Sequence, residues 1–195
     1  MSVRRVVVTG GPGAGKTVLL DELARRGYPY APESARTIIR ERLARGLPPR
    51  PDPGEFAYEI LGRDIEQYRA AGERSGRAGQ GGPEREIYFF DRSILDALGM
   101  LDQLGLLSAR ERDRHLTEYP YHPRAFILPP WEAIYQVDSE RDQTFAESVR
   151  VHDSLRQWYV RCGYEIVSVP PGPVADRCDL VLKALEPGIA PRRTR

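Results

Sequence analysis

The stretch from Gly10 to Thr17, Gly-Gly-Pro-Gly-Ala-Gly-Lys-Thr, is the sequence feature that most constrains the fold of this chain. It has the spacing G-x-x-x-x-G-K-[ST] of a phosphate-binding loop, which works only between a buried strand and the start of a helix. Val6, Val7 and Val8 precede it, and Val18, Leu19, Leu20 and Leu23 follow at helical spacing. Because both flanks are correct, the pattern favours a nucleotide site over the alternative of an ordinary glycine-rich turn.

Each part of the loop has a predicted role in binding Mg·ATP. Glycines let the backbone N–H groups turn inward, and the N-terminus of the following helix adds the positive end of its dipole. Lys16 is expected to reach the β- and γ-phosphates, and the Thr17 hydroxyl to bind Mg²⁺. The predicted nucleotide-binding residues are Gly11, Pro12, Gly13, Ala14, Gly15, Lys16, Thr17 and Val18.

Length and composition indicate an ordinary globular protein. The chain has 195 residues, of which 41% are hydrophobic and 29% charged, with a net charge of +1. This size suits one α/β domain, and the charge balance gives no support for extensive nucleic-acid binding. Two cysteines, no apolar run long enough to span a membrane and no signal-peptide pattern favour a cytoplasmic protein without a membrane partner. The sequence does not indicate an oligomeric state.

Apolar runs alternate with amphipathic segments along the chain, which predicts a doubly wound parallel sheet flanked by helices. Strands are expected at residues 3–9, 86–91, 124–128 and 164–169, with a short extended piece at 28–32. Helical periodicity also predicts that Leu43, Leu104 and Val149 face inward. We expect a single domain over residues 1–186, with a mobile loop at 72–83, a lid at 130–144 and a disordered tail at 187–195.

Polar residues at the predicted strand ends are the candidates for catalysis, since ligands of parallel sheets bind beyond the carboxyl ends of the strands. Asp91 follows a buried strand and is placed to hold Mg²⁺ opposite Thr17, although it could instead cap the next helix. Arg92 offers planar donors for phosphate, or alternatively a surface ion pair.

Two further charged residues are assigned by their position near the predicted cleft. Glu33 follows the second extended piece and could accept a hydroxyl proton or position a substrate, or it could be a surface residue at a helix start. Arg141 lies in a charged segment before a long helix, and a mobile arginine there could cover the phosphates; Arg150 is the reserve. Charge runs are also common on solvated faces.

The ordered set of motifs resembles a known family over about residues 3 to 186. The phosphate loop, Pro32-Glu33, Phe90-Asp91-Arg92-Ser93, Asp138-x-x-Arg141 and Val169-Pro170 together resemble the AAA-like ATPases related to the nicotinamide riboside kinase domain. The likeness to thymidylate and deoxyribonucleoside kinases is more distant. The resemblance implies that Arg92 contacts phosphate, Glu33 contacts the substrate hydroxyl, Arg141 belongs to a lid, and Pro170, Pro171 and Gly172 lie near the adenine base.

These observations predict an ATP-dependent phosphotransferase acting on a small molecule of nucleoside or nucleotide type. Transfer of this kind depends on positioning and charge, which fits many cations and no covalent nucleophile. The alternative is an ATP-hydrolysing switch that binds a protein partner. Asp96-x-x-Gly99 and Asp102-x-x-Gly105 match the Asp-x-x-Gly sequence pattern of a GTPase switch, but both lie in a predicted helix.

The segment from Leu47 to Pro83 matches no known acceptor pocket, so the sequence does not identify the acceptor.

Overall fold

A parallel β-sheet forms the centre of the structure, a computed structural model that describes residues 3–77, 87–134 and 144–186. Its strands are short and apolar: β1 (Arg4–Gly10), β2 (Tyr30–Ala31), β3 (Ile87–Asp91), β4 (Arg124–Leu128) and β5 (Glu165–Ser168). Within the described residues they are arranged in the order β2-β3-β1-β4-β5, with every neighbouring pair parallel. The predicted α/β class with a parallel sheet is confirmed.

The register of the central strands brings their carboxyl ends together. Val8 of β1 pairs with Asp91 on one side and with Phe126 on the other, and Gly10 pairs with Leu128. Since all strands run the same way, the segments that follow β1, β3 and β4 leave from one edge of the sheet. This edge carries the phosphate loop.

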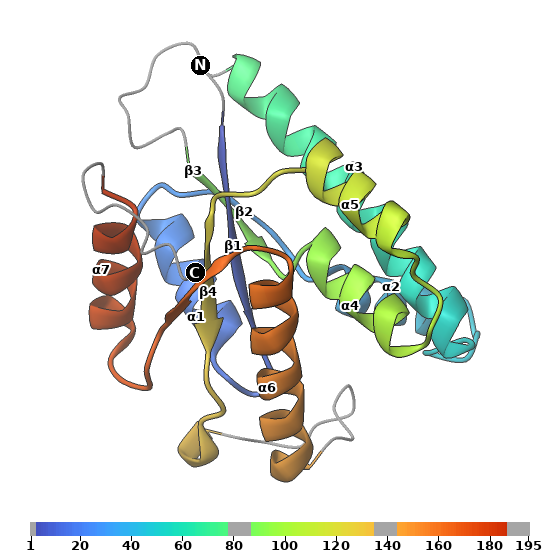
Figure 1. The fold of residues 1–195 in the computed structure, drawn as a ribbon. Coiled ribbons are helices and arrows are strands. Elements are labelled where there is room, and N and C mark those ends of the chain that lie inside the picture. The colour runs from blue at the N-terminus through green and yellow to red at the C-terminus, as the bar shows by residue number, and fades with distance from the viewer. Residues whose placement is uncertain (1–2, 78–86, 135–143, 187–195) are drawn as a thin grey trace.

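Seven α-helices in the described residues surround the sheet (Figure 1), in addition to a short 3-10 helix at Glu132–Ile134. Their bounds are α1 (Lys16–Arg25), α2 (Ser34–Ala44), α3 (Pro53–Arg77), α4 (Ile94–Gln103), α5 (Ala109–Glu118), α6 (Phe145–Arg161) and α7 (Val174–Ala184). Three of them begin with a capping box, at Ser93 for α4, Ser108 for α5 and Thr144 for α6. The box of α5 has the sequence pattern Ser108-x-x-Glu111 that is typical of such caps.

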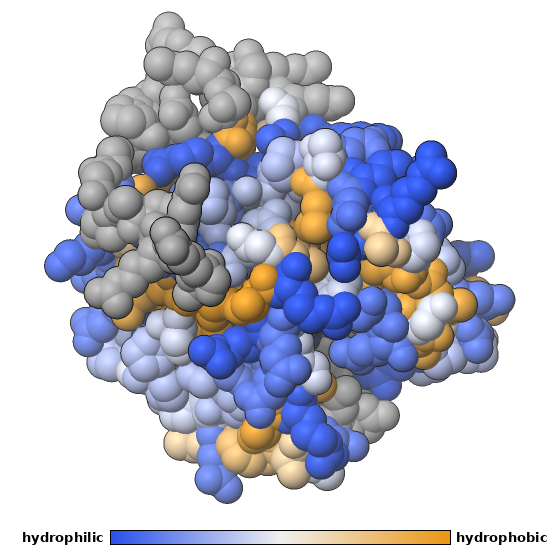
Figure 2. Space-filling model, in the orientation of Figure 1, coloured by the Kyte–Doolittle hydropathy of each residue, from blue (hydrophilic) through white to orange (hydrophobic). Residues whose placement is uncertain are grey.

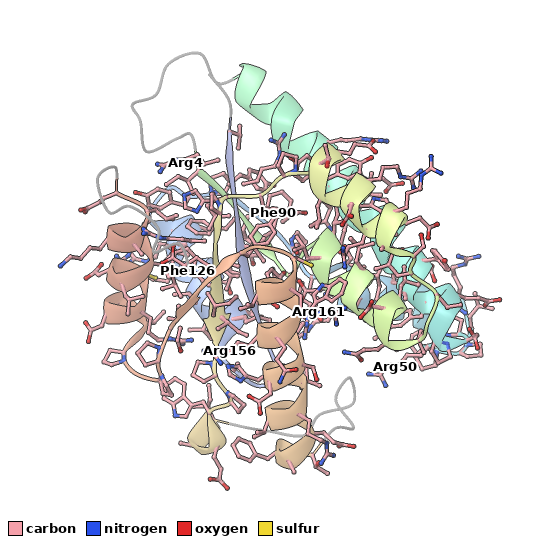
Figure 3. The ribbon with its side chains drawn as sticks, viewed as in Figure 1. Arg4, Arg50, Phe90, Phe126, Arg156 and Arg161 are labelled. Carbon is pink, nitrogen blue, oxygen red and sulfur yellow. The ribbon has the colours of Figure 1, made fainter. Side chains whose placement is uncertain are left out.

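Alternating side chains of the sheet divide the core into two parts. Val7 and Phe90 pack with α2, α3, α4 and α6, whereas Val8 and Phe126 pack with α1 and α7. Phe90 and Phe126 accordingly lie on opposite sides of the sheet in Figure 3. Successive residues of a strand point to opposite faces, so one continuous apolar run fills both parts of the core.

The prediction from helical periodicity that three apolar residues face inward is wrong, because all three are exposed. Leu43, Leu104 and Val149 are 52%, 45% and 37% exposed. Each lies near the end of a helix, where the apolar pattern continues but the surface to pack against does not. The predicted loop also begins later than expected, because α3 extends to Arg77 and includes residues 72–77. The rest of that loop lies outside the described residues.

The face in Figure 2 is mainly hydrophilic, with hydrophobic patches separated from one another. No helix in the described part of the chain is long and apolar enough to cross a membrane. The predicted tail and most of the predicted lid, residues 135–143, lie outside the described residues.

Candidate active site

The phosphate loop curves tightly against β4 and α6. A Cβ atom at Gly10 would lie 2.5 Å from the carbonyl oxygen of Leu128, and one at Gly11 would lie 2.8 Å from that of Ser148. Gly15 has a φ of 77°, a left-handed conformation that glycine adopts without strain, and is the N-cap of α1. Because glycine has no side chain to cap the helix, the first N–H groups of α1 are left for a ligand.

The side chains of the loop differ in exposure. Gly11, Gly13, Ala14 and Lys16 are buried, Pro12 and Gly15 are half-buried, and Thr17 and Val18 are exposed. The Lys16 ammonium donates to the carbonyl oxygens of Gly10 and Gly11 at 3.1 Å each. Burial, followed by the charge of Arg92, lowers the pKa of Lys16, while Asp91 and Glu33 oppose this shift. An incoming phosphate would supply the negative charge that favours the ammonium form.

Asp91 ends β3 beside this loop, as predicted. Its carboxyl group is buried, and its Oδ1 atom has no hydrogen-bond partner among the described residues. The pKa of Asp91 is raised to about 6, because burial and the charge of Glu33 outweigh the opposing charges of Lys16, Arg92 and Arg36. An unpartnered carboxylate oxygen and the exposed Thr17 hydroxyl are hard oxygen ligands, so their chemistry fits Mg²⁺, which takes few protein ligands and completes its shell with phosphate and water.

Arg92 is held in an unusual backbone conformation next to Asp91. It is the non-glycine residue with a positive φ, 67°, in the part of the chain that the structure describes. Such a conformation costs on the order of 1 kcal/mol and is maintained by its surroundings. The Arg92 N–H donates to Val8 O at 2.9 Å, and its guanidinium contacts Glu33 Oε1 at 3.1 Å and Asp96 Oδ1 at 3.3 Å.

Glu33 stands between two arginines at the start of α2. Its Oε1 atom contacts Arg92, and its Oε2 atom contacts Arg36 Nε at 3.0 Å. Burial by itself would raise the pKa of Glu33, but Arg92, Lys16 and Arg36 together lower it below the ordinary value. Glu33 is therefore an ionised carboxylate, suited to orient a hydroxyl group more than to remove its proton outright.

Asp96 anchors this arrangement, and sequence reasoning missed it. Its Oδ1 atom accepts from Thr9 Oγ1 at 2.6 Å, and its Oδ2 atom accepts from Tyr159 OH at 2.6 Å and from Ser93 N at 2.9 Å. In the sequence, Asp96 is noticeable only through the Asp96-x-x-Gly99 spacing, which resembles a GTPase switch motif but lies in a helix. The signal that could have found it is the capping-box spacing from Ser93 to Asp96. Asp96 ties β1, α4 and α6 together behind Arg92.

A cavity of about 750 Å³ opens from the phosphate loop into the helical layer. Lys16, Glu33 and Arg92 all line it, so the structure brings these three predicted residues together. Apolar side chains of α2, α3, α4 and α6 form part of the wall, namely Ile39, Phe56, Ile60, Met100, Leu155 and Trp158. The volume is that of a site for a small organic molecule.

The cavity also has charged residues that the sequence did not identify. Arg36 and Arg50 line it, and Figure 3 shows Arg50 at the end of the molecule beside α4. Asp64 of α3 lines it as well, with its Oδ1 atom bonded to the Ser34 hydroxyl and its Oδ2 atom unpartnered among the described residues. Burial raises the pKa of Asp64 to about 7. No sequence motif marks these residues, because they come from α2, from the connection between α2 and α3, and from α3.

The other predicted site residues are spread more widely. Arg141 lies outside the described residues, so its role in a lid stays a prediction. Its reserve, Arg150, lines the cavity from α6 and lies 4.0 Å from Glu147. Pro170 and Pro171 are exposed and Gly172 is half-buried, in the turn between β5 and α7. Their predicted contact with a base stays a prediction.

Comparisons with known proteins agree with this architecture. A sequence model described as an AAA domain matches residues 5–177, and no curated protein matches. Among solved structures, deoxyadenosine kinase from M. mycoides with bound dATP is 13% identical with a TM-score of 0.52, covering 93% of this chain and 98% of that chain. Thymidylate kinase from Ehrlichia chaffeensis is 15% identical with a TM-score of 0.61, covering 95% and 100%.

A third solved structure, the NadR protein in complex with NR, is 17% identical with a TM-score of 0.63. The match covers 99% of this chain but 54% of the NadR chain, so this chain spans about half of that protein. At such low identities the likeness shows the fold alone. The fold is that of P-loop NTPases similar to nucleoside and nucleotide kinases.

Proposed function

The chain belongs to the AAA domain family, and we propose that it is a P-loop phosphotransferase that moves the γ-phosphate of Mg·ATP onto a small molecule. The observation that carries this proposal is the cavity of about 750 Å³ that ends at Lys16 and is lined by Glu33 and Arg92. A hydrolytic switch has no need of a second chamber for a small molecule beside its phosphate loop.

The residues of the site would divide the work between binding and transfer. The loop backbone and Lys16 would hold the triphosphate, and Thr17 with Asp91 would hold Mg²⁺, which when bound neutralises charge on the phosphates. Glu33, fixed between Arg36 and Arg92, would accept a hydrogen bond from the acceptor hydroxyl and align it with the γ-phosphate. Arg92 would donate to the phosphoryl group as charge develops on it.

The cavity wall favours an acceptor with a planar apolar part and polar substituents. Phe56 and Trp158 offer aromatic surface, while Asp64 and the arginines offer hydrogen bonds. Nucleosides, nucleotides and related ribosides have this combination of groups. The volume of the cavity is in the range of sites that bind small molecules.

A panel of nucleosides, nucleotides, ribosides and amino sugars tests the proposal. Each compound is incubated with the protein and Mg·ATP, ADP release is followed, and products are identified by mass spectrometry. We expect at least one acceptor to gain a phosphate, with ADP release rising in proportion. If ADP release responds to no acceptor but rises with a protein partner, the switch is the correct function.

A further inference from the structure

Arg177 is a buried cation with no carboxylate partner in the part of the chain that the structure describes, and it lies on the opposite side of the phosphate loop from the acceptor cavity. It belongs to the first turns of α7 and is 4% exposed. Its Nη2 atom donates to Ala14 O at 3.3 Å, and its Nε atom has no partner among the described residues. Burial lowers the pKa of Arg177. A desolvated guanidinium is stable only where an anion compensates it.

Another buried arginine shows what compensation looks like in this fold. Arg124 is 5% exposed, and its guanidinium contacts Glu165 at 3.0 Å and Ala184 O at 2.6 Å. Arg177 is buried to the same extent, but in the described residues no carboxylate lies within ion-pair distance of it. Among the described residues, therefore, nothing neutralises the charge of Arg177, and a bound anion would do so.

The surroundings of Arg177 indicate which anion this is. A Cβ atom at Gly15 would lie 3.1 Å from Arg177 Nη1 and 3.3 Å from Ile134 Cδ1, so both side chains rest on the loop at this glycine. The Arg177 guanidinium also lies 5.7 Å from the ring centroid of Trp131. Trp131 is half-buried and Ile134 is 40% exposed, which leaves aromatic and aliphatic surface beside the cation.

The loop therefore separates two chemically different sides. Pro12 and Lys16 face the acceptor cavity, whereas Ala14 and Gly15 face Arg177 and Ile134, and Trp131 lies next to Arg177. A nucleoside triphosphate whose terminal phosphate lies at Lys16 has its sugar and base on the other side. We propose that Arg177 binds the phosphate nearest the sugar and that the base of the nucleotide stacks on Trp131. This inference rests on the proposed function, since it assigns the nucleoside end of the same nucleotide.

The two tryptophans of the chain provide a direct test. Trp131 is placed at the nucleotide base, whereas Trp158 lines the acceptor cavity, where its Nε1 atom donates to Leu95 O at 2.7 Å. We expect Mg·ATP to change the tryptophan emission of the wild type and of Trp158→Phe, and to leave that of Trp131→Phe unchanged. A full response in Trp131→Phe overturns the proposal.

Calorimetry with Mg·ATP and with Mg·tripolyphosphate separates the base from the phosphates. Trp131→Ala should bind ATP about tenfold more weakly, because a stacked base is lost, and should bind tripolyphosphate as the wild type does. Arg177→Met should weaken both ligands about tenfold. Arg156→Met, on the exposed face of α6 seen in Figure 3, should weaken neither.

The results that would contradict this inference differ from those that would contradict the proposed function. Equal losses of both ligands in Trp131→Ala would mean that Trp131 only braces the loop, and wild-type affinity in both site variants would mean that neither residue binds nucleotide. Either result overturns this inference while leaving the proposed function intact. A wild-type chain that binds neither ligand overturns the proposed function and this inference with it.

Discussion

The phosphate loop and the acceptor cavity meet at Lys16 but are built by different means. The loop is a continuous segment between β1 and α1, and its shape comes from backbone contacts such as the close approach of Gly10 to Leu128. The cavity is lined by side chains of α2, α3, α4 and α6, which extend from Glu33 to Trp158 in the sequence. A loop that binds through its backbone N–H groups recognises any polyphosphate, whereas a cavity lined by side chains recognises one class of molecule.

This difference implies that substitutions can impair nucleotide binding by the loop and acceptor binding by the cavity independently. Changes in the loop should remove nucleotide binding whatever the acceptor is. Changes in the cavity should spare nucleotide binding and affect transfer, and changes elsewhere in the scaffold should affect stability alone.

Lys16→Ala should raise the Kd for Mg·ATP about a hundredfold or more. The substitution removes the ammonium group that is poised on the carbonyl oxygens of Gly10 and Gly11, and hydrogen bonds to charged groups are the strong ones. Isothermal calorimetry measures the effect. The other lysine of the chain, the exposed Lys183, supplies the matched control as Lys183→Ala. Unchanged affinity in Lys16→Ala would show that the loop does not bind ATP in this way.

Glu33→Gln should lower kcat for phosphate transfer about a hundredfold, while the Kd for Mg·ATP changes by less than about threefold. The amide keeps the size of the side chain but loses the charge that Arg36 and Arg92 hold in place, and such groups contribute at least this much. Steady-state kinetics with the identified acceptor measures kcat, and the exposed Glu55→Gln is the control. A comparable loss of ATP affinity would place Glu33 on the nucleotide instead of the acceptor.

The separation between the regions also explains what the sequence could predict. Short segments of the sequence predict four of the features: the loop, the parallel sheet, Asp91 at the end of β3 and the neighbouring Arg92. Each of these segments is a buried apolar run, a glycine turn or a residue directly after one. Glu33 was placed by its position after an extended piece. These features are local, so a single sequence contains the information that specifies them.

The cavity could not be predicted, because its residues share no local pattern. Asp64 looks like any acidic residue on an amphipathic helix until α3 packs beside Ser34. Arg177, on the other side of the phosphate loop, likewise looks like a surface residue of α7 until its contact with Ala14 is seen. Leu43 fails for the opposite reason, since its helical spacing is correct but no surface covers it. Tertiary packing decides these positions, and packing depends on elements far apart in the chain.

Asp64→Asn should flatten the pH dependence of stability. Burial raises the pKa of Asp64 to about 7 in the folded chain, from an ordinary value of 3.8. Between these values the folded chain keeps a proton that the unfolded chain releases, so the free energy of unfolding falls as the pH rises. Between pH 5 and pH 7, Asp64 should contribute about 2 kcal/mol to this fall in the wild type. Asp64→Asn should lack this contribution, because an asparagine side chain does not titrate.

Urea unfolding of both proteins at pH 5 and pH 7 measures this difference. The exposed Asp176→Asn is the control and should keep the wild-type fall. A fall in Asp64→Asn as large as that of the wild type would show that Asp64 is ionised throughout this range. The cavity would then present a fixed negative charge at this position to its ligand.

Ser108→Ala should cost about 1 kcal/mol of stability and leave every ligand affinity unchanged. Ser108 caps α5 and forms a reciprocal box with Glu111, and loss of such a cap has a cost of this size. Thermal or urea unfolding measures the cost, and calorimetry with Mg·ATP checks the affinity. Weaker nucleotide binding in this variant would mean that scaffold and site are not separable.

The central claim is that the γ-phosphate moves from the loop to a molecule in the adjoining cavity. The most direct measurement is a single turnover with ATP labelled in its γ-phosphate, using the best acceptor of the panel. We predict that most of the label is recovered on the acceptor, and that Glu33→Gln retains bound ATP but transfers its phosphate about a hundredfold more slowly. Recovery of the label as inorganic phosphate alone, at the same rate with and without acceptor, would contradict the claim.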